Sequence, residues 1–113
     1  MTSDIRRPLS PAVLHILLAL TDGAQHGYAI KQEAESRSEG AVRLGPGTLY
    51  TAIQRLLDAQ LVRETSAEQD PANGQEAQRR YYELTPRGRR VLREEVAQLG
   101  RLLAYARGKQ ETA

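Results

Sequence analysis

The segment from Leu44 to Val62 constrains the fold most, because the start, the buried face and the end of one helix can all be identified in it. Gly45 is a suitable N-cap, and Pro46 a suitable first residue, since the N–H that proline lacks would have no helical partner there. Gln60 marks the predicted end. Four apolar residues recur at three- and four-residue spacing and predict a buried face: Leu49, Ile53, Leu56 and Leu57.

The remaining face of this helix is polar and predicts contact with DNA. It carries hydroxyl, aromatic, amide and guanidinium groups, which suit base edges and phosphates: Thr48, Tyr50, Thr51, Gln54 and Arg55. Thr48 lies in the first turn, where unpaired N–H groups and the positive end of the helix dipole favour phosphate. Packing of Tyr50 between this helix and its neighbour is the alternative for that side chain.

The rest of the chain predicts a mainly α fold with a small β-hairpin. Capped by Ser10, a first helix with a wide apolar face runs from Pro11 to about Thr21, and a second from about His26 to Arg37. Residues 61–65 and 79–84 favour strands, and the polar segment between them contains Asp-Pro and Asn-Gly turn signals. A last helix, capped by Thr85, runs from Pro86 to about Arg107.

Length and charge limit the classes of protein that the chain can be. At 113 residues it fits one domain with an extension. The formal net charge is only +2, so nucleic-acid binding requires a local basic patch. Cysteine is absent, which excludes disulfides and thiolate sites and favours a cytoplasmic protein. Arg6 and Arg7 before the apolar run 12–20 resemble a signal peptide, but we interpret that run, too short for a membrane span, as a buried helix.

The last helix carries a stripe of the kind found in coiled coils. Its apolar residues alternate four- and three-residue steps: Leu92, Val96, Leu99, Leu103 and Ala106. Because a small domain cannot cover the whole stripe, a second copy of the chain is the expected partner, and packing on the chain's own first helix is the alternative. The arginines at 87, 89, 90 and 93, with Glu94 and Glu95, predict a salt-bridged outer face.

No enzyme is expected. Gly40 and Gly45 have the spacing of a phosphate-binding loop, but Pro46 stands where that motif needs lysine. His15 and His26 are too isolated to predict a metal site. We therefore expect no catalytic residue, no metal and no cofactor.

Three helices, a hairpin and a long terminal helix together predict a winged helix-turn-helix with a C-terminal dimerisation helix. Several separated motifs resemble the PadR family of bacterial transcriptional regulators. These are His26-Gly27-Tyr28-Ala29-Ile30, Pro46-Gly47-Thr48-Leu49-Tyr50 followed by Arg55-Leu56-Leu57 and Leu61-Val62, and Tyr81-Tyr82-Glu83-Leu84-Thr85 with Gly88. The resemblance covers about residues 9–107.

The resemblance implies a homodimeric repressor that binds a pseudo-palindromic operator and is released by a small ligand. It implies DNA-reading roles for the exposed positions of 48–55 named above, with Tyr28 and Lys31 near the DNA backbone and Arg79 and Arg80 on the wing. Inward packing is the simpler alternative for Tyr28, and solvated strand positions for the two arginines. The segment between the two predicted strands, the wing tip, departs from the family pattern, because it carries acidic residues that phosphates repel: Glu68, Asp70 and Glu76.

We accordingly divide the chain into a DNA-binding domain (1–85), a dimerisation helix (86–108) and a frayed tail (109–113). Symmetry would place two recognition helices about 34 Å apart, one turn of DNA. The acidic wing tip leaves one competing hypothesis, a winged-helix module that binds a protein or ligand and no DNA.

Overall fold

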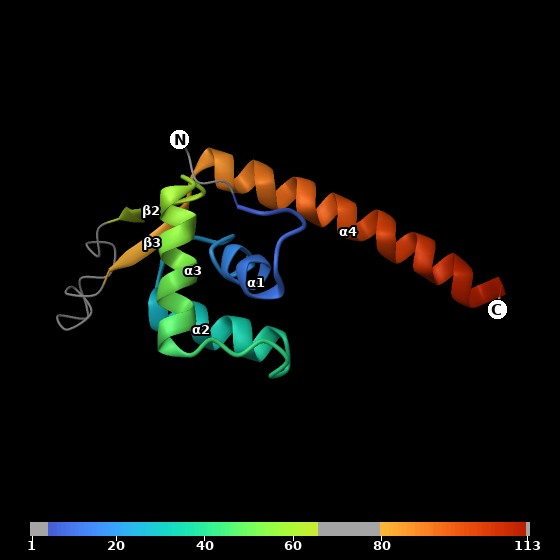
Figure 1. Ribbon diagram of the computed structural model, residues 1–113, viewed down its shortest axis with the longest axis horizontal. Coiled ribbons are helices and arrows are strands. Elements are labelled where there is room, and N and C mark those ends of the chain that lie inside the picture. Colours follow the sequence, from blue (N-terminus) through green and yellow to red (C-terminus); the bar gives the residue numbers. More distant parts are fainter. Residues whose placement is uncertain (1–4, 66–79, 113) are drawn as a thin grey trace.

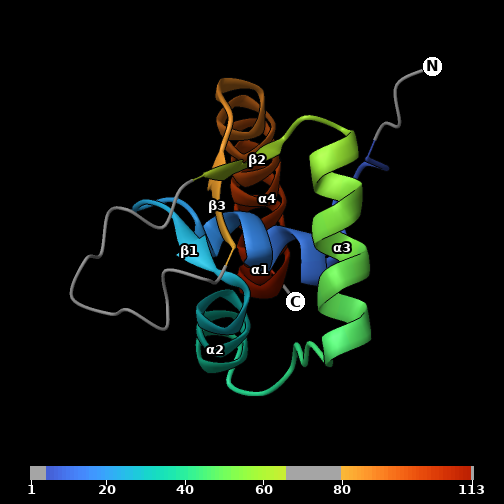
Figure 2. The same cartoon turned by 90° about the vertical axis from the view of Figure 1, so that its left-hand side faces the viewer.

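The computed structural model describes residues 5–65 and 80–112 and confirms a winged helix-turn-helix followed by a long helix (Figure 1). The elements in chain order are α1 (Pro11–Ala19), β1 (Gln25–His26), α2 (Gly27–Arg37), α3 (Pro46–Asp58), β2 (Val62–Thr65), β3 (Tyr81–Leu84) and α4 (Pro86–Thr112). In Figure 2, α3 and the strands lie on opposite sides of α1, and α4 is seen almost along its axis.

A single core lies between the first three helices, the sheet and the root of α4. α1 and its C-cap supply the centre of this core, since Ile16, Leu17 and the C-cap Leu20 have at most 1% of their surface exposed. Ile30 of α2 and Leu56 of α3 are fully buried against the same core. Ser10 caps α1 by accepting a hydrogen bond from the Val13 N–H at 3.2 Å. The wide apolar face of the first helix is therefore used on several sides, as predicted.

Within the described residues the sheet has three strands, where the sequence indicated two. β3 lies in the centre and pairs antiparallel with both β1 and β2. The sequence indicated no strand between the first two helices, yet Gln25 pairs with Tyr82 in β1. Gln25 also donates a hydrogen bond from Nε2 to the Ala19 carbonyl at 2.9 Å, which ties the new strand to the end of α1.

The helix α4 divides into a root and an arm. The root packs on the domain through Gly88, Leu92 and Glu95, whereas every residue from Val96 to Gln110 is exposed. The sequence predicts Leu92 as part of the apolar stripe that pairs two copies, here called the dimer seam. In the structure Leu92 belongs instead to the chain's own core, with 7% of its surface exposed. The helix also continues to Thr112, beyond the end at about Arg107 that the sequence predicted.

Candidate nucleic-acid interface

The helix α3, which the sequence predicted to read DNA, presents the polar face that the sequence indicated. Leu49, Ala52, Ile53 and Leu56 are buried, and all five predicted DNA-reading residues are exposed: Thr48, Tyr50, Thr51, Gln54 and Arg55. Tyr50 has 66% of its surface exposed, so it does not pack between the helices as the alternative held. Gln54 donates a hydrogen bond to Asp58 at 3.1 Å across one exposed turn. The face is thus open to a ligand along its length.

The N-terminal end of α3 is available to an anion. Gly45 is the N-cap and has no side chain to accept from the first turn, and Pro46 follows it. The backbone N–H groups of Gly47 and Thr48 therefore lack the side-chain acceptor that Ser10 gives α1. Such an end, with the helix dipole behind it, favours phosphate binding.

The connection before α3 is held by Glu35 of α2. Its Oε2 accepts the Leu44 N–H at 3.1 Å, and its Oε1 accepts from Lys31 Nζ at 3.1 Å. The bond from Leu44 is the main reason that the pKa of Glu35 lies below its ordinary value, with the bond from Lys31 as the second cause. Lys31 thus lies half-buried beside the helix-turn-helix turn, with its ammonium group already paired.

Tyr28, at the start of α2, is 58% exposed, so the interpretation that it packs inward is wrong. The Tyr28 hydroxyl accepts a hydrogen bond from Nε2 of Gln32, which lies one helical turn further along α2. His26 caps the same helix, because its Nδ1 accepts the Ala29 N–H at 3.2 Å, and its ring lies edge-on to Tyr81. Through these two contacts, His26 joins the start of α2 to the strand β3.

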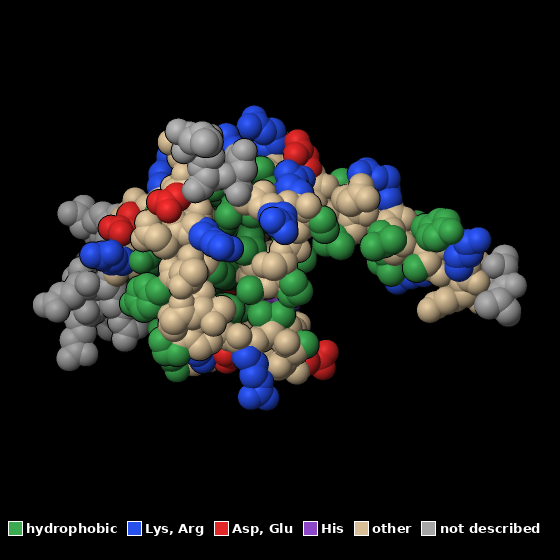
Figure 3. Space-filling model, viewed as in Figure 1, with side chains coloured by type: hydrophobic (Ala, Val, Ile, Leu, Met, Phe, Trp, Pro, Cys, Tyr) green, Lys and Arg blue, Asp and Glu red, His purple; other side chains and the backbone are tan. Residues whose placement is uncertain are grey.

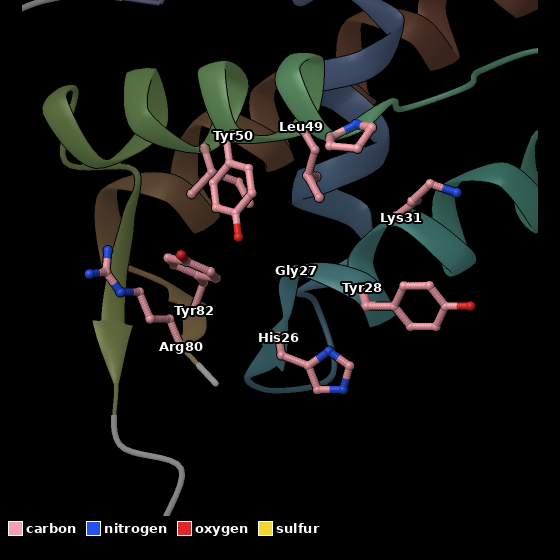
Figure 4. Close-up of a pocket in the computed structure, with 10 residues that line it drawn as sticks. His26, Gly27, Tyr28, Lys31, Leu49, Tyr50, Arg80 and Tyr82 are labelled. Carbon is pink, nitrogen blue, oxygen red and sulfur yellow. The ribbon is translucent and has the colours of Figure 1, made fainter. Parts of the chain in front are cut away.

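A cavity of about 450 Å³ lies between the starts of α2 and α3 and the strand β3 (Figure 4). In the close-up, Tyr50 extends from α3 toward Tyr82, while Tyr28 projects outward from α2. The lining contains cationic and aromatic side chains and no carboxylate: His26, Gly27, Tyr28, Lys31, Pro46, Leu49, Tyr50, Ile53, Arg80 and Tyr82. Four predicted DNA-contact residues meet here, and burial raises the pKa of Tyr82 above its ordinary value.

The base of the wing supplies one described cation to this site. Arg80 has 74% of its side chain exposed and lies 3.7 Å from a carboxylate oxygen of Glu64. Further along the wing, Arg63 Nε donates to Glu83, its partner across β2 and β3, at 2.7 Å. Arg79 and the acidic residues Glu68, Asp70 and Glu76 lie outside the described residues.

Within residues 5–65 and 80–112, no three acidic or histidine side chains form a group that could hold a metal ion. No described helix is long and apolar enough to cross a membrane. The predicted salt-bridged outer face of α4 is wrong for Glu95, which is buried and bonded to Arg7.

The chain is similar to two curated proteins and to a solved structure. The chain is 38% identical over 98 residues to the transcriptional regulator Rv3488 of Mycobacterium tuberculosis, covering 86% of this chain and 83% of that protein. It is 41% identical over 91 residues to an uncharacterized 37.1 kDa protein in transposon TN4556 of Streptomyces fradiae, covering 80% of this chain but only 24% of that protein. A PadR family transcription regulator from Clostridium difficile R20291 superposes with a TM-score of 0.67 at 26% identity, covering 88% and 97% of the chains.

The family model that matches the chain spans most of the winged helix and the root of α4. It is described as the transcriptional regulator PadR-like family and matches residues 16–94. This range includes α2, α3 and both strands of the wing. The chain therefore belongs to the PadR-like family of transcriptional regulators.

Proposed function

We propose that the chain acts as a homodimer that binds a pseudo-palindromic operator and represses the promoter that contains it. The observation that carries the proposal is the exposed polar face of α3 together with its uncapped N-terminus. Major-groove base edges require such hydrogen-bonding side chains, and the phosphates beside them require N–H groups and cations. In this arrangement Gln54 and Arg55 contact bases, and Thr48, Lys31 and Arg80 hold the backbone.

The second copy is proposed on the apolar arm of α4. Val96, Leu99 and Leu103 are 47%, 39% and 51% exposed, although three leucine-like side chains at helical spacing normally lie in a core. Figure 3 shows hydrophobic side chains along the arm beyond the body of the domain. A twofold pair of arms would bury them and place two α3 helices on one face of DNA.

Repression is the simplest effect of such a dimer, since a protein that covers promoter DNA excludes other proteins from it. A small-molecule effector that lowers operator affinity completes the proposal and follows from the family resemblance. A winged helix that binds only protein or ligand remains the second candidate, favoured by the acidic residues at 68, 70 and 76.

Fluorescence-anisotropy titration tests the proposal, with a duplex from directly upstream of the gene and a scrambled duplex over a salt series. We expect preference for the upstream duplex, with affinity falling steeply as salt rises.

Arg55→Ala should cost about 1–3 kcal/mol of specific binding and reduce the preference for the upstream duplex. Arg101→Ala, exposed on the outer side of the arm of α4, is the matched control and should change affinity little. Absence of binding to any duplex at low salt would favour the second candidate.

A further inference from the structure

Glu95 is a buried carboxylate on the face of α4 that otherwise carries apolar side chains. It is 4% exposed and lies one turn after Leu92 and one turn before Leu99. A leucine at this position would extend the apolar stripe, whereas an ionised carboxylate is costly to bury unless donors surround it. The position of the charge therefore calls for a structural reason.

The donors come from the segment before α1, residues 5–9, which we call the strap. Glu95 Oε2 accepts the Leu9 N–H at 3.1 Å, and Oε1 accepts from Arg7 Nε at 3.3 Å. Arg7 also lies 3.6 Å from the exposed carboxylate of Glu94. Leu9 itself is 7% exposed, and Ser10, the cap of α1, follows it directly. Glu95 thus bonds the start of α1 to α4 through two directional contacts.

These contacts lie where the arm leaves the domain. Glu95 is the last buried residue of α4 up to Gln110. The root is fixed at Gly88, which packs against the Leu61 backbone. At 1.5 Å per residue, Glu95 stands about 10 Å from Gly88, and Ala106 about 27 Å from it. A displacement at Glu95 is therefore magnified roughly 2.6-fold at the far end of the seam.

We propose that Glu95 is a positioning residue that fixes the direction of the arm relative to α3. Apolar side chains tolerate sliding and rotation, whereas hydrogen bonds to a buried charge specify one geometry. In the dimer proposed above, on which this step rests, the direction of the arm sets the distance between the two recognition helices. Glu95 and the strap thereby determine which separation of operator half-sites the protein accepts.

Distance measurement within one chain tests the positioning directly. Because the sequence has no cysteine, Ser36→Cys on α2 and Arg101→Cys on the outer side of the arm give two defined spin-label sites, both exposed. Dilution with unlabelled protein removes distances between chains. We expect one narrow distance distribution in the wild type and in the control Glu94→Gln, which loses only the exposed partner of Arg7. Glu95→Leu, which restores the apolar stripe, should broaden or shift it.

Glu95→Gln keeps the size of the side chain and provides the same test if the leucine variant does not fold. Hydrogen exchange adds a second readout. The Leu9 amide should exchange about tenfold faster or more in Glu95→Leu, which removes its acceptor, and less so in Glu95→Gln, which keeps one acceptor oxygen. Its exchange should be unchanged in Glu94→Gln. A distribution as narrow as the wild type's in a folded Glu95 variant would overturn the proposal, because apolar packing alone would then direct the arm.

Operator spacing tests the consequence for DNA. The wild type should prefer one half-site separation by about tenfold over duplexes lengthened or shortened by two base pairs, and Glu95→Leu should reduce that preference to about threefold or less. An undiminished preference would overturn the link to spacing. If the wild type neither dimerises nor binds DNA, the proposed function fails, while the intrachain distances still decide whether Glu95 positions the arm.

Discussion

At the scale of single residues, Gly88 shows how closely α4 approaches the domain. A Cβ at this position would lie 2.0 Å from the backbone oxygen of Leu61, closer than any non-bonded contact allows. Thr85 fixes the same approach, because its N–H donates to the Leu61 carbonyl at 3.0 Å and its Oγ1 accepts the Gly88 N–H at 2.9 Å. Only glycine leaves room for this capped start of the helix.

Gly88→Ala is therefore expected to destabilise the domain by about 1–3 kcal/mol, because the backbone of Leu61 must move. Gly100→Ala is the matched control, since a Cβ there meets nothing within 4 Å. It should stabilise by about 0.5–1 kcal/mol through helix propensity alone. Urea denaturation of the two variants measures both effects, and equal free energies of unfolding would contradict the close approach.

At the scale of elements, the connection from α2 to α3 decides how the recognition helix is presented. Ser38 Oγ accepts the Val42 N–H at 2.9 Å, and Gly40 has a φ of 84°, which suits a residue without a side chain. Glu35 completes the turn through the Leu44 N–H and Lys31. The loop is ordered by α2, so α3 begins from a fixed position.

Acid should loosen this connection. Because the pKa of Glu35 is lower in the folded protein, the carboxylate stabilises the fold above the ordinary glutamate value of 4.5, and this contribution is lost as pH falls through the folded pKa. Glu35→Gln should therefore be less stable than the wild type near pH 6, with a difference that shrinks toward pH 3. Urea denaturation over this range measures the difference, and a constant value at every pH would contradict the assignment.

At the scale of the whole molecule, the arm gives the chain its elongated shape, with a longest dimension of 57 Å. Its exposed apolar side chains have no partner within the described part of the chain. The domain and the arm thus separate two tasks in the proposed regulator, contact with DNA and pairing with a second copy.

Leu99→Asp should yield monomers, because a carboxylate would be buried between the proposed arms. Operator affinity should then fall by about a hundredfold or more, since the two half-sites would bind independently. Ala97→Asp adds the same charge on the opposite side of the arm and should remain a dimer. Sedimentation velocity and the anisotropy titration are the measurements; a stable dimer of Leu99→Asp would refute the seam.

The sequence determined those features whose causes are local. The start of α3 follows from Gly45 and Pro46, and its two faces follow from the 3.6-residue period, so its fold and exposure could be predicted. The predicted strand around Tyr81 and Tyr82 is confirmed, and its cause is also local, since tyrosine favours strands. Motif resemblance supplied the family, which the match over residues 16–94 establishes.

Tertiary structure decided what depends on residues far apart in the chain. The strand β1 is only two residues long and exists because β3, 55 or more positions later, offers it hydrogen bonds. Leu92 and Leu99 belong to the same apolar stripe, yet the folded domain covers Leu92 and leaves Leu99 39% exposed. Glu95 resembles any surface charge until Arg7 and Leu9 surround it. Periodicity shows which face of a helix is apolar, but burial depends on which segment packs against it.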